Sequence, residues 1–303
     1  MFVSGVGNTN IDLIFSGLPR IPNEGEELYS ESFTLQMGGG IPATLINLGR
    51  LGVPTRIQTM LGSDMFSDFA RSVFAQSHVQ PVNLYHGDKI PLNITAVILT
   101  PADRTFVSFS DQIPITDDMK QAVYEASHGA RIVEMHLGYL DVYRTLKKEG
   151  TTLIFDTGWE DDLSLEKYID YIELADYYTP NQKEALKITG TSTPAAAANV
   201  LADYFDHVIV KLDKDGCLIQ ENGKNTLIPN IAEYVHQDST GAGDAFLSGL
   251  IYGLYHGYNF KESILFGNIT GGKCITGTGC LTAYCTENEL LETAEKYRSL
   301  LNG

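Results

Sequence analysis

Basic residues are scarce in this sequence. Its 303 residues include 21 lysines and arginines against 38 aspartates and glutamates, a formal net charge of −17 at pH 7. Nucleic acids and anionic membrane surfaces both attract proteins through clustered positive charge. So acidic a composition argues against a nucleic-acid partner and against a membrane partner.

Long apolar runs are also missing. No segment approaches the roughly 18 apolar residues of a transmembrane helix. The N-terminal segment lacks a basic start and has Asn8, Asn10 and Asp12 where a signal peptide is apolar. We therefore expect these residues to begin the first strand of the fold, and we expect the protein to be cytoplasmic.

Cysteine is rare as well, whereas glycine is mildly enriched, with 4 and 29 residues. The cysteines are Cys217, Cys274, Cys280 and Cys285. None forms a C-x-x-C pair, and no histidine cluster completes a zinc pattern. A disulfide framework is not expected for a chain of this size in the cytoplasm. We expect reduced thiols with a structural role.

Short apolar runs alternate with helical patterns along most of the chain. Strands are predicted at 2–7, 56–61, 131–136, 152–156, 207–212 and 217–220. Helices are predicted at 42–51, 65–76, 117–127, 163–174, 182–189, 194–204, 242–256, 261–275 and 287–301. This alternation predicts an α/β fold with a mostly parallel central sheet and helices on both faces.

Two stretches interrupt the alternation, at about 10–36 and 86–112. The second contains strand-like segments at 93–100 and 104–110 around a Pro101-Ala102-Asp103 turn. Neither stretch has a convincing helical pattern. We interpret residues 1–303 as a single domain in which both stretches form a small β-sheet lid that excludes water from an active site.

The strongest functional signal is Asp238-Ser239-Thr240-Gly241-Ala242-Gly243-Asp244, which follows a segment predicted to be extended (233–236) and opens a long helix. Small residues at a helix start expose backbone N–H groups, and the helix dipole adds partial positive charge. Gly241, Ala242 and Gly243 are therefore candidates for an anion cradle. Asp244 suits a base that takes a proton from a hydroxyl attacking a phosphate. The alternative is a helix-capping role for Asp244.

Two further segments suit a small polar ligand. Gly38-Gly39-Gly40 precedes a helix with Pro42 in its first turn, and three glycines permit close backbone approach. Asn8-Thr9-Asn10-Ile11-Asp12 follows the first strand, and ligands of open α/β sheets bind beyond the carboxyl ends of strands. The alternatives are a flexible loop and a solvated turn.

The fourth segment is a capping box, with Asn181 at a helix start and Glu184 three residues later. A structural role explains it fully. Common phosphate-binding loops are absent. The glycine fingerprint that begins at Gly5 is broken at Asn10, which argues against a nicotinamide-dependent oxidoreductase, and Gly223-Lys224 lacks the rest of a Walker loop. A phosphate-transferring enzyme with this sequence needs another phosphate-binding device.

Together and in this order, these four motifs resemble the ribokinase-like (PfkB-type) family of sugar and nucleoside kinases. The resemblance covers essentially the whole chain. Segment 238–250 matches the C-terminal signature of the family, and segment 38–52 matches the N-terminal signature less fully. The resemblance implies a doubly wound α/β domain with a β-sheet lid. It also implies phosphoryl transfer from ATP with Mg²⁺ to a primary hydroxyl.

The resemblance assigns roles to individual residues. Asp244 is expected to deprotonate the acceptor, with Gly241, Ala242 and Gly243 forming the anion hole. Sugar binding is expected at Asn10, Asp12, Gly39 and Gly40, and at the positions of Ala43 and Gly138. Nucleotide binding is expected at Asn181, Lys211, Asp213, Gly216, Gly243 and Asn268. Glu184 is expected to hold Mg²⁺ through water, and Asp238 and Thr240 to line a monovalent-cation site for K⁺.

Departures from the family pattern bear on the substrate. Ala43 stands where many members have a sugar-binding Asn, and Gly138 where ribokinases have a Glu, so ribose itself is disfavoured. Lys211 and Asp213 replace a Thr and a Gly, and Lys211 is expected to pair with a phosphate or with Asp213.

A phosphorylated acceptor would need basic side chains near the sugar. The glycine loop has none, and the predicted lid offers only Arg20, Lys89 and Arg104. We therefore expect a small neutral sugar, with a nucleoside as the alternative and a non-catalytic ligand sensor as the alternative from another class. The outer face of the lid is a candidate for homodimerisation. Candidates either for that face or for the sugar pocket are Phe33, Leu35, Phe106 and Phe109.

Overall fold

The computed structural model describes residues 1–302 and is centred on a six-stranded parallel sheet with the strand order β10-β9-β8-β1-β4-β5. The strands are β1 (Val3–Val6), β4 (Thr55–Thr59), β5 (Val79–Asn83), β8 (Ile132–Met135), β9 (Thr152–Phe155) and β10 (Tyr177–Tyr178). The chain runs outward from β1 to β5 on one side and then returns to build β8, β9 and β10 on the other. This reversal makes the carboxyl end of β1 a topological switch point, where open α/β sheets bind ligands.

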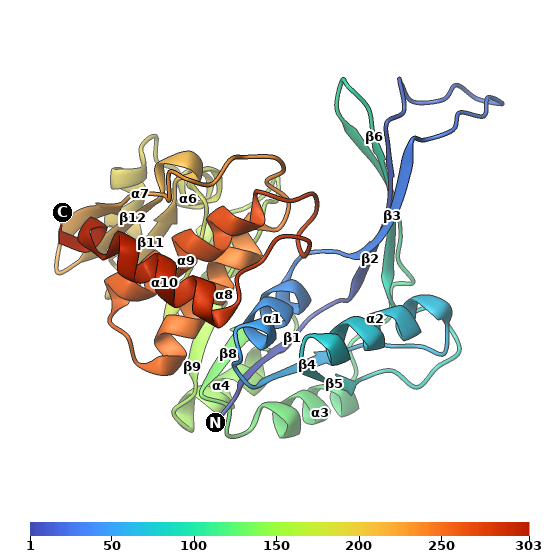
Figure 1. The fold of residues 1–303 in the computed structure, drawn as a ribbon. Coiled ribbons are helices and arrows are strands. Elements are labelled where there is room, and N and C mark those ends of the chain that lie inside the picture. Colours follow the sequence, from blue (N-terminus) through green and yellow to red (C-terminus); the bar gives the residue numbers. More distant parts are fainter. Residues whose placement is uncertain (303) are drawn as a thin grey trace.

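Helices cover both faces of this sheet (Figure 1). One face carries α1 (Ile41–Arg50), α2 (Met65–Gln76), α8 (Ala242–His256), α9 (Phe260–Cys274) and α10 (Glu287–Tyr297). The other carries α3 (Asp117–Ser127), α4 (Leu140–Lys148), α5 (Leu165–Ile172), α6 (Gln182–Thr189) and α7 (Pro194–Leu201). Successive strand residues enter opposite cores, with Ile132 in one and Val133 in the other. The doubly wound α/β prediction is therefore confirmed.

A three-stranded antiparallel sheet lies beside β10. Its strands are β11 (His207–Lys211), β12 (Cys217–Glu221) and β13 (Lys224–Ile228). A parallel bridge between Asn181 and Lys211 joins this sheet to the region of β10. The strands predicted at 207–212 and 217–220 thus form a hairpin rather than part of a parallel sheet. The reason is the short Asp213–Asp215 connection, because a parallel partner needs a crossover of about a dozen residues.

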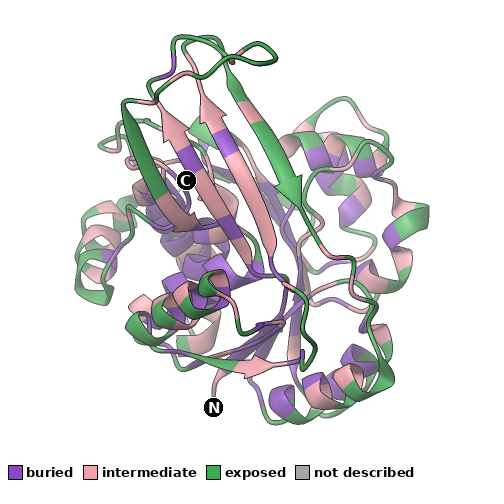
Figure 2. Cartoon of the chain, turned by 90° about the vertical axis from the view of Figure 1, so that its right-hand side faces the viewer, coloured by how far each residue is buried: buried purple, intermediate pink, exposed green. Residues whose placement is uncertain are grey.

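Segments 10–36 and 86–112 build a four-stranded sheet with the order β3-β2-β6-β7. Its strands are β2 (Asn10–Ser16), β3 (Ser32–Met37), β6 (Asn93–Leu99) and β7 (Arg104–Phe109). Figure 1 shows these strands rising out of the helix-covered body. In Figure 2 they are mostly half-buried or exposed, whereas the central strands behind them are buried.

The register of the four-stranded sheet separates a polar face from an apolar one. Asp12, Thr95 and Ser108 form one cross-strand row, and Leu13, Ala96 and Val107 form the adjacent row on the opposite face. The register also places the four candidate side chains of this sheet. Phe33, Leu35 and Phe109 share the apolar face, and Phe106 shares the polar one.

Several elements differ from the predictions. The sequence patterns miss α4, β5, β10 and β13. The segment predicted to be extended at 233–236 begins in a turn, in which Tyr234 donates its N–H to the carbonyl of Ile231, and residues 234–236 are not part of a strand. The N–H groups of Gln237 and Asp238 then bond to the carbonyl of Ile275, so this stretch has no strand partner.

All four cysteines are free and buried, as the sequence predicts. Within residues 1–302, none of the helices combines the length and the apolar character needed to cross a membrane.

Candidate active site

A polar cavity of about 640 Å³ lies between the polar face of the four-stranded sheet and the carboxyl ends of the central strands. Its wall includes Asn8, Asn10, Asp12, Gly38, Gly39, Met60, Pro91, Asn93, Thr95, Ser108, Phe109, Ser110, Asp111, Gln112 and Ile113. Amides, hydroxyls and two carboxylates dominate this wall. Within the described part of the chain, no lysine or arginine lines it. Such a lining matches the hydroxyl groups of a neutral polar molecule.

The N-terminus of α8 presents Gly241, Ala242 and Gly243. Gly241 caps the helix in the left-handed conformation, with φ = 76°, and a Cβ there would collide with Cys280. Glycine is therefore required by backbone conformation and by space. The first N–H groups of the helix have no intrahelical partner, so this end can bind an anion.

Asp244 connects the two glycine segments. Its Oδ2 accepts a hydrogen bond of 2.9 Å from the N–H of Gly40, although 204 residues separate them in sequence. A Cβ on Gly39 would lie only 2.6 Å from the same oxygen, so the loop closes on Asp244 only because it lacks side chains. The structure thus brings the predicted base and the predicted sugar-binding loop into direct contact.

The environment of Asp244 suits a base that works near neutral pH. Burial is the main cause that raises its pKa to about 6, and the negative charge of Asp156 also raises it. The hydrogen bond from Gly40 and the positive charge of Lys211 lower the pKa and so oppose this rise. A carboxylate with this pKa is ionised at neutral pH and is a stronger base than an ordinary aspartate.

Lys211 pairs with Asp156, not with Asp213. Its Nζ lies 3.0 Å from Asp156 Oδ2, and both side chains are largely buried. Asp156 also accepts a 3.0 Å hydrogen bond from Thr179 Oγ1. Burial lowers the pKa of Lys211, but Asp156, Glu184 and Asp244 raise it by more, so the pKa is raised overall. Lys211 therefore stays positively charged beside the N-terminus of α8, where a Cβ on Gly243 would be 3.4 Å from Nζ.

Asp156 is a site residue that the sequence analysis missed. It follows the last residue of β9, at the carboxyl edge of the sheet. The signal that could have found it is its position, a carboxylate directly after a buried strand on the edge where α/β sheets bind ligands.

Asn181 and Glu184 form the predicted capping box at the start of α6. The Asn181 side chain accepts from the Glu184 N–H at 3.0 Å, and Glu184 Oε2 accepts from the Asn181 N–H at 2.8 Å. Burial, followed by the charge of Asp156, raises the pKa of Glu184. The structural role is therefore present, and the carboxylate also faces the charged group around Lys211.

Two predicted substrate residues lie away from the cavity wall. Ala43 is completely buried in the hydrophobic core on α1. Gly138 adopts φ = 95° after β8, donates its N–H to Tyr171 Oη at 2.8 Å, and packs against Ile115.

Three predicted nucleotide residues support the loops around β11–β13. Asn268 is buried and donates Nδ2 to the carbonyls of Ile228 and Pro229, at 3.0 and 3.1 Å. Asp213 and Gly216 both have positive φ in the β11–β12 turn, at 51° and 99°. These residues shape the surface beside Lys211.

Asp238 and Thr240 form a closed turn ahead of Gly241. Asp238 Oδ1 accepts from the Thr240 N–H at 3.0 Å and from Thr240 Oγ1 at 2.8 Å, and Oδ2 accepts from the Gly279 N–H at 2.9 Å. Arg104 Nη1 donates to Thr240 Oγ1 at 3.1 Å and lies 3.9 Å from Asp238 Oδ1. Although burial acts against it, these hydrogen bonds together with Arg104 lower the pKa of Asp238.

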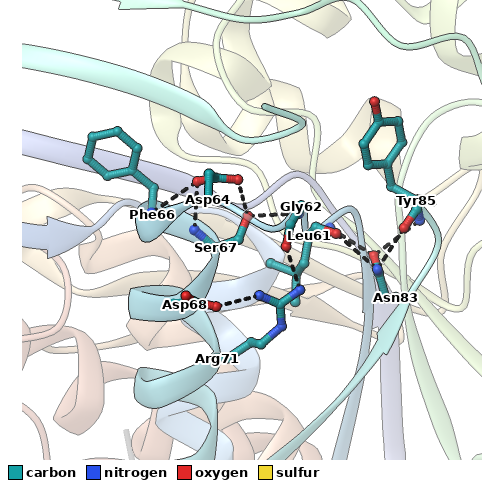
Figure 3. Close-up of polar contacts among 9 residues, drawn as sticks. All are labelled: Leu61, Gly62, Asp64, Phe66, Ser67, Asp68, Arg71, Asn83 and Tyr85. Carbon is teal, nitrogen blue, oxygen red and sulfur yellow. Dashed lines mark hydrogen bonds and ion pairs between the residues drawn. The ribbon is translucent and has the colours of Figure 1, made fainter. Parts of the chain in front are cut away.

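A hydrogen-bond network behind the cavity wall supports the loop after β4 (Figure 3). Asp64 caps α2 by accepting from the N–H groups of Phe66 and Ser67. Asn83, at the end of β5, accepts from the Leu61 N–H at 2.8 Å. The Asn83 bond holds Leu61, the residue after Met60, and Met60 lines the cavity.

Glu134 is a second carboxyl that the sequence analysis missed. It lies in the middle of β8, is buried, and accepts a 3.5 Å hydrogen bond from Thr44 on α1. Burial, then the negative charges of Asp244 and Asp156, raise its pKa well above its usual value.

Within residues 1–302, no group of three or more histidine, cysteine and acidic side chains is arranged to hold a metal ion.

Comparison with known proteins agrees with the fold. Residues 2–287 match the family described as pfkB family carbohydrate kinase. An ATP-dependent 6-phosphofructokinase of Thermoanaerobacterium thermosaccharolyticum is 24% identical over 283 residues, covering 86% of this chain and 84% of the relative. A ribokinase of Lactococcus lactis is 24% identical over 274 residues, covering 86% of each.

A solved structure gives the same result at the level of fold. The Arabidopsis thaliana ribokinase complexed with ribose and ATP superimposes with a TM-score of 0.80 and 21% identity, covering 97% of this chain and 98% of that one.

Proposed function

The chain belongs to the pfkB family of carbohydrate kinases, and on that premise we propose that it transfers the γ-phosphoryl group of ATP to a primary hydroxyl of a small neutral sugar. The observation that carries this proposal is the 2.9 Å hydrogen bond between Gly40 and Asp244. It joins the start of helix α8, a partly buried base and the loop that borders the polar cavity.

The charge of the cavity supports a neutral acceptor. Asp12 and Asp111 line it, and each of the three basic residues of the four-stranded sheet and its connections already has an acidic partner. Arg20 pairs with Glu26, Lys89 with Asp111, and Arg104 with the Asp238 turn. A phosphorylated or carboxylated acceptor would meet negative charge without a free cation, which costs binding energy.

The proposed chemistry uses residues of this chain directly. Asp12, Asn10 and the Gly39–Gly40 backbone orient the hydroxyls of the acceptor. Asp244 accepts the proton of the attacking hydroxyl. The Gly241–Gly243 amides and Lys211 stabilise the charge on the transferred phosphoryl group. The four-stranded sheet acts as a lid that keeps water away from ATP.

The nucleotide is proposed to lie over α6 and the β11–β12 turn, beside Asn181, Lys211, Asp213, Gly216, Gly243 and Asn268. Glu184 fits Mg²⁺ held through water, because its carboxylate lies among the charged groups around Lys211. When bound, Mg²⁺ would neutralise phosphate charge.

K⁺ fits less well at Asp238 and Thr240, since both Asp238 oxygens already accept hydrogen bonds and a guanidinium lies beside them. No step of this proposal uses K⁺.

ADP release measured with a panel of pentoses, hexoses, keto-sugar acids, sugar phosphates and nucleosides tests the proposal. We expect turnover with a neutral sugar and little with charged acceptors. Asp244→Asn should lower turnover about 10²- to 10⁴-fold, the usual contribution of a general base, while ATP binding persists. Turnover of this variant at the wild-type rate would overturn the assignment of the base.

Two other outcomes of the panel have defined meanings. Preference for nucleosides would indicate a nucleoside kinase. Ligand binding without ADP release would indicate a sensor.

The apolar face of the four-stranded sheet is proposed to pair with a second copy of the chain. Phe33 and Val107 on this face are 55% and 65% exposed.

A cytoplasmic location is part of the proposal, since ATP is available there and the four cysteines are free thiols.

A further inference from the structure

Arg104 links two parts of the molecule that are far apart in sequence. It is the first residue of β7, at the turn that connects β6 to β7. Its Nη1 donates a 3.1 Å hydrogen bond to Thr240 Oγ1, 136 residues away, and lies 3.9 Å from Asp238 Oδ1. The outer part of the four-stranded sheet is thereby attached to the turn that leads into α8.

The orientation of Arg104 places it on the cavity side. Alternation along β7 puts Arg104, Phe106 and Ser108 on the same face, and Ser108 lines the cavity. The guanidinium lies 5.9 Å from the centre of the Phe106 ring. Arg104 therefore extends from the face of the sheet that covers the acceptor, and it reaches the opposite wall of the active site.

The turn that Arg104 contacts determines where the anion hole lies. Thr240 is held by two hydrogen bonds to Asp238 Oδ1, and the next residue is Gly241. Gly241 lies directly against Cys280, which leaves little space for a compensating shift. Movement of Thr240 therefore moves the amides of Gly241–Gly243.

We propose that Arg104 is a positioning residue that couples the four-stranded sheet to the anion hole. When the sheet covers the cavity, its guanidinium reaches the Asp238–Thr240 turn, adds positive charge there and holds the amides in place. When the sheet lifts, the contact breaks and the turn loses this support. The anion hole is then fully ordered only when the acceptor is covered. This inference rests on the proposed kinase function for its catalytic consequence, and on the observed contacts for its structural part.

The contact is suited to a reversible link. The Arg104 side chain is about half exposed, at 51%, and exposed ion pairs add little to folding stability. Arg104→Ala should therefore fold normally. Catalysis is far more sensitive than folding to small displacements of the groups that touch the transition state.

Arg104→Ala, Arg104→Lys and Arg20→Ala form the test set. Arg20 is the matched control, because it belongs to the same lid but pairs with Glu26 within it. With the best acceptor from the panel, Arg104→Ala should lower kcat roughly ten- to a hundredfold with little change in the KM for the acceptor. Arg104→Lys should recover part of the loss, and Arg20→Ala should match wild type.

A second measurement does not depend on activity. Hydrogen–deuterium exchange, followed by mass spectrometry on the unliganded variants, should show faster exchange at residues 239–244 in Arg104→Ala and unchanged exchange there in Arg20→Ala. Faster exchange in a protein without kinase activity would uphold the link and refute the proposed function.

Three results would overturn the link. One is exchange at 239–244 that is the same in Arg104→Ala and Arg20→Ala. Another is equal kcat for these two variants with an active acceptor. The third is a change confined to the KM for the acceptor, which would mean that Arg104 binds the acceptor rather than positioning the anion hole.

Discussion

The titration of Asp244 gives a prediction at the scale of a single residue. Burial raises its pKa to about 6, so the ionised form that can accept a proton accumulates as the pH rises through that value. We expect kcat/KM to rise with pH along an acidic limb centred near 6 and then to level off. The pH dependence of kcat/KM with the best acceptor measures this limb.

Asp156→Asn tests the cause of the shift. The negative charge of Asp156 raises the pKa of Asp244. Asp156 also pairs with Lys211, whose positive charge lowers the pKa of Asp244. Removing the Asp156 charge should therefore move the acidic limb to lower pH. A limb that stays in place or moves upward would show that another group is titrating. Asp203→Asn, on an exposed residue, should leave the profile unchanged.

Some single residues of the candidate site could be predicted from the sequence, and others could not. Gly241 and Asp244 could be predicted because small residues and a carboxylate at a helix start have a local chemical meaning. The Asp156–Lys211 pair could not be derived, because these residues are 55 positions apart and their meeting depends on the three-dimensional fold. Ala43 is the opposite case, a residue that was predicted for the site but lies away from the cavity wall. A position for which the family resemblance implies sugar binding here holds a methyl group that is buried in the core.

The contact between α8 and α9 gives a prediction at the scale of elements. Gly249 on α8 lies so close to α9 that a Cβ would collide with the carbonyl of Phe266 and with Thr270 Oγ1. Gly249→Ala should lower the free energy of unfolding by about 1–3 kcal/mol or more, as overpacking of a core does. Urea-induced unfolding measures the loss.

The same substitution should affect catalysis, because the proposed anion hole lies at the N-terminus of α8. Ser72→Ala, on the exposed side of α2, is the control and should change stability by less than about 0.5 kcal/mol. Unfolding of Gly249→Ala at the wild-type urea concentration would contradict the close packing of these helices.

Elements were predictable where a pattern was long. The apolar periodicity of α8 and α9 and the apolar runs of β1 and β8 are strong local signals. By contrast, β10 contains two residues and is a strand only because β9 lies beside it. Helix α4 was missed because its nine residues have three basic side chains and one acidic one, so its apolar stripe of Val142, Tyr143 and Leu146 is short.

At the scale of the whole molecule, the acidic composition has a consequence for substrate choice. With 21 basic against 38 acidic residues, the chain has few cations to spare. Lys211 lies beside the proposed anion hole and pairs with Asp156. Arg20, Lys89 and Arg104 pair with acidic side chains in the four-stranded sheet, in its connections and below it. At the phosphate end, Lys211 and the start of α8 supply positive charge among the carboxylates of Asp156, Glu184 and Asp244. The wall of the acceptor cavity contains Asp12 and Asp111 and no basic side chain. This division favours an acceptor without charge.

The apolar face of the four-stranded sheet gives the last prediction, which concerns assembly. Its rows contain Leu13, Leu35 and Val107, with Phe15 and Phe33 beside them at a ring-centroid distance of 5.2 Å. Exposed apolar patches of this kind mark interaction surfaces. We expect a dimer in solution. A charge in the patch would have to be desolvated, so Val107→Glu should give a monomer.

Sedimentation equilibrium of wild type, Val107→Glu and Leu227→Glu measures this assembly. Leu227 is the control, because it is also exposed but lies on β13, in a different sheet. Glu at position 107 should dissociate the dimer without lowering the melting temperature, because Val107 is mostly in solvent within one chain. A dimer that survives Val107→Glu but not Leu227→Glu would place the interface at the β11–β13 sheet, and a monomeric wild type would leave the apolar face without a partner copy.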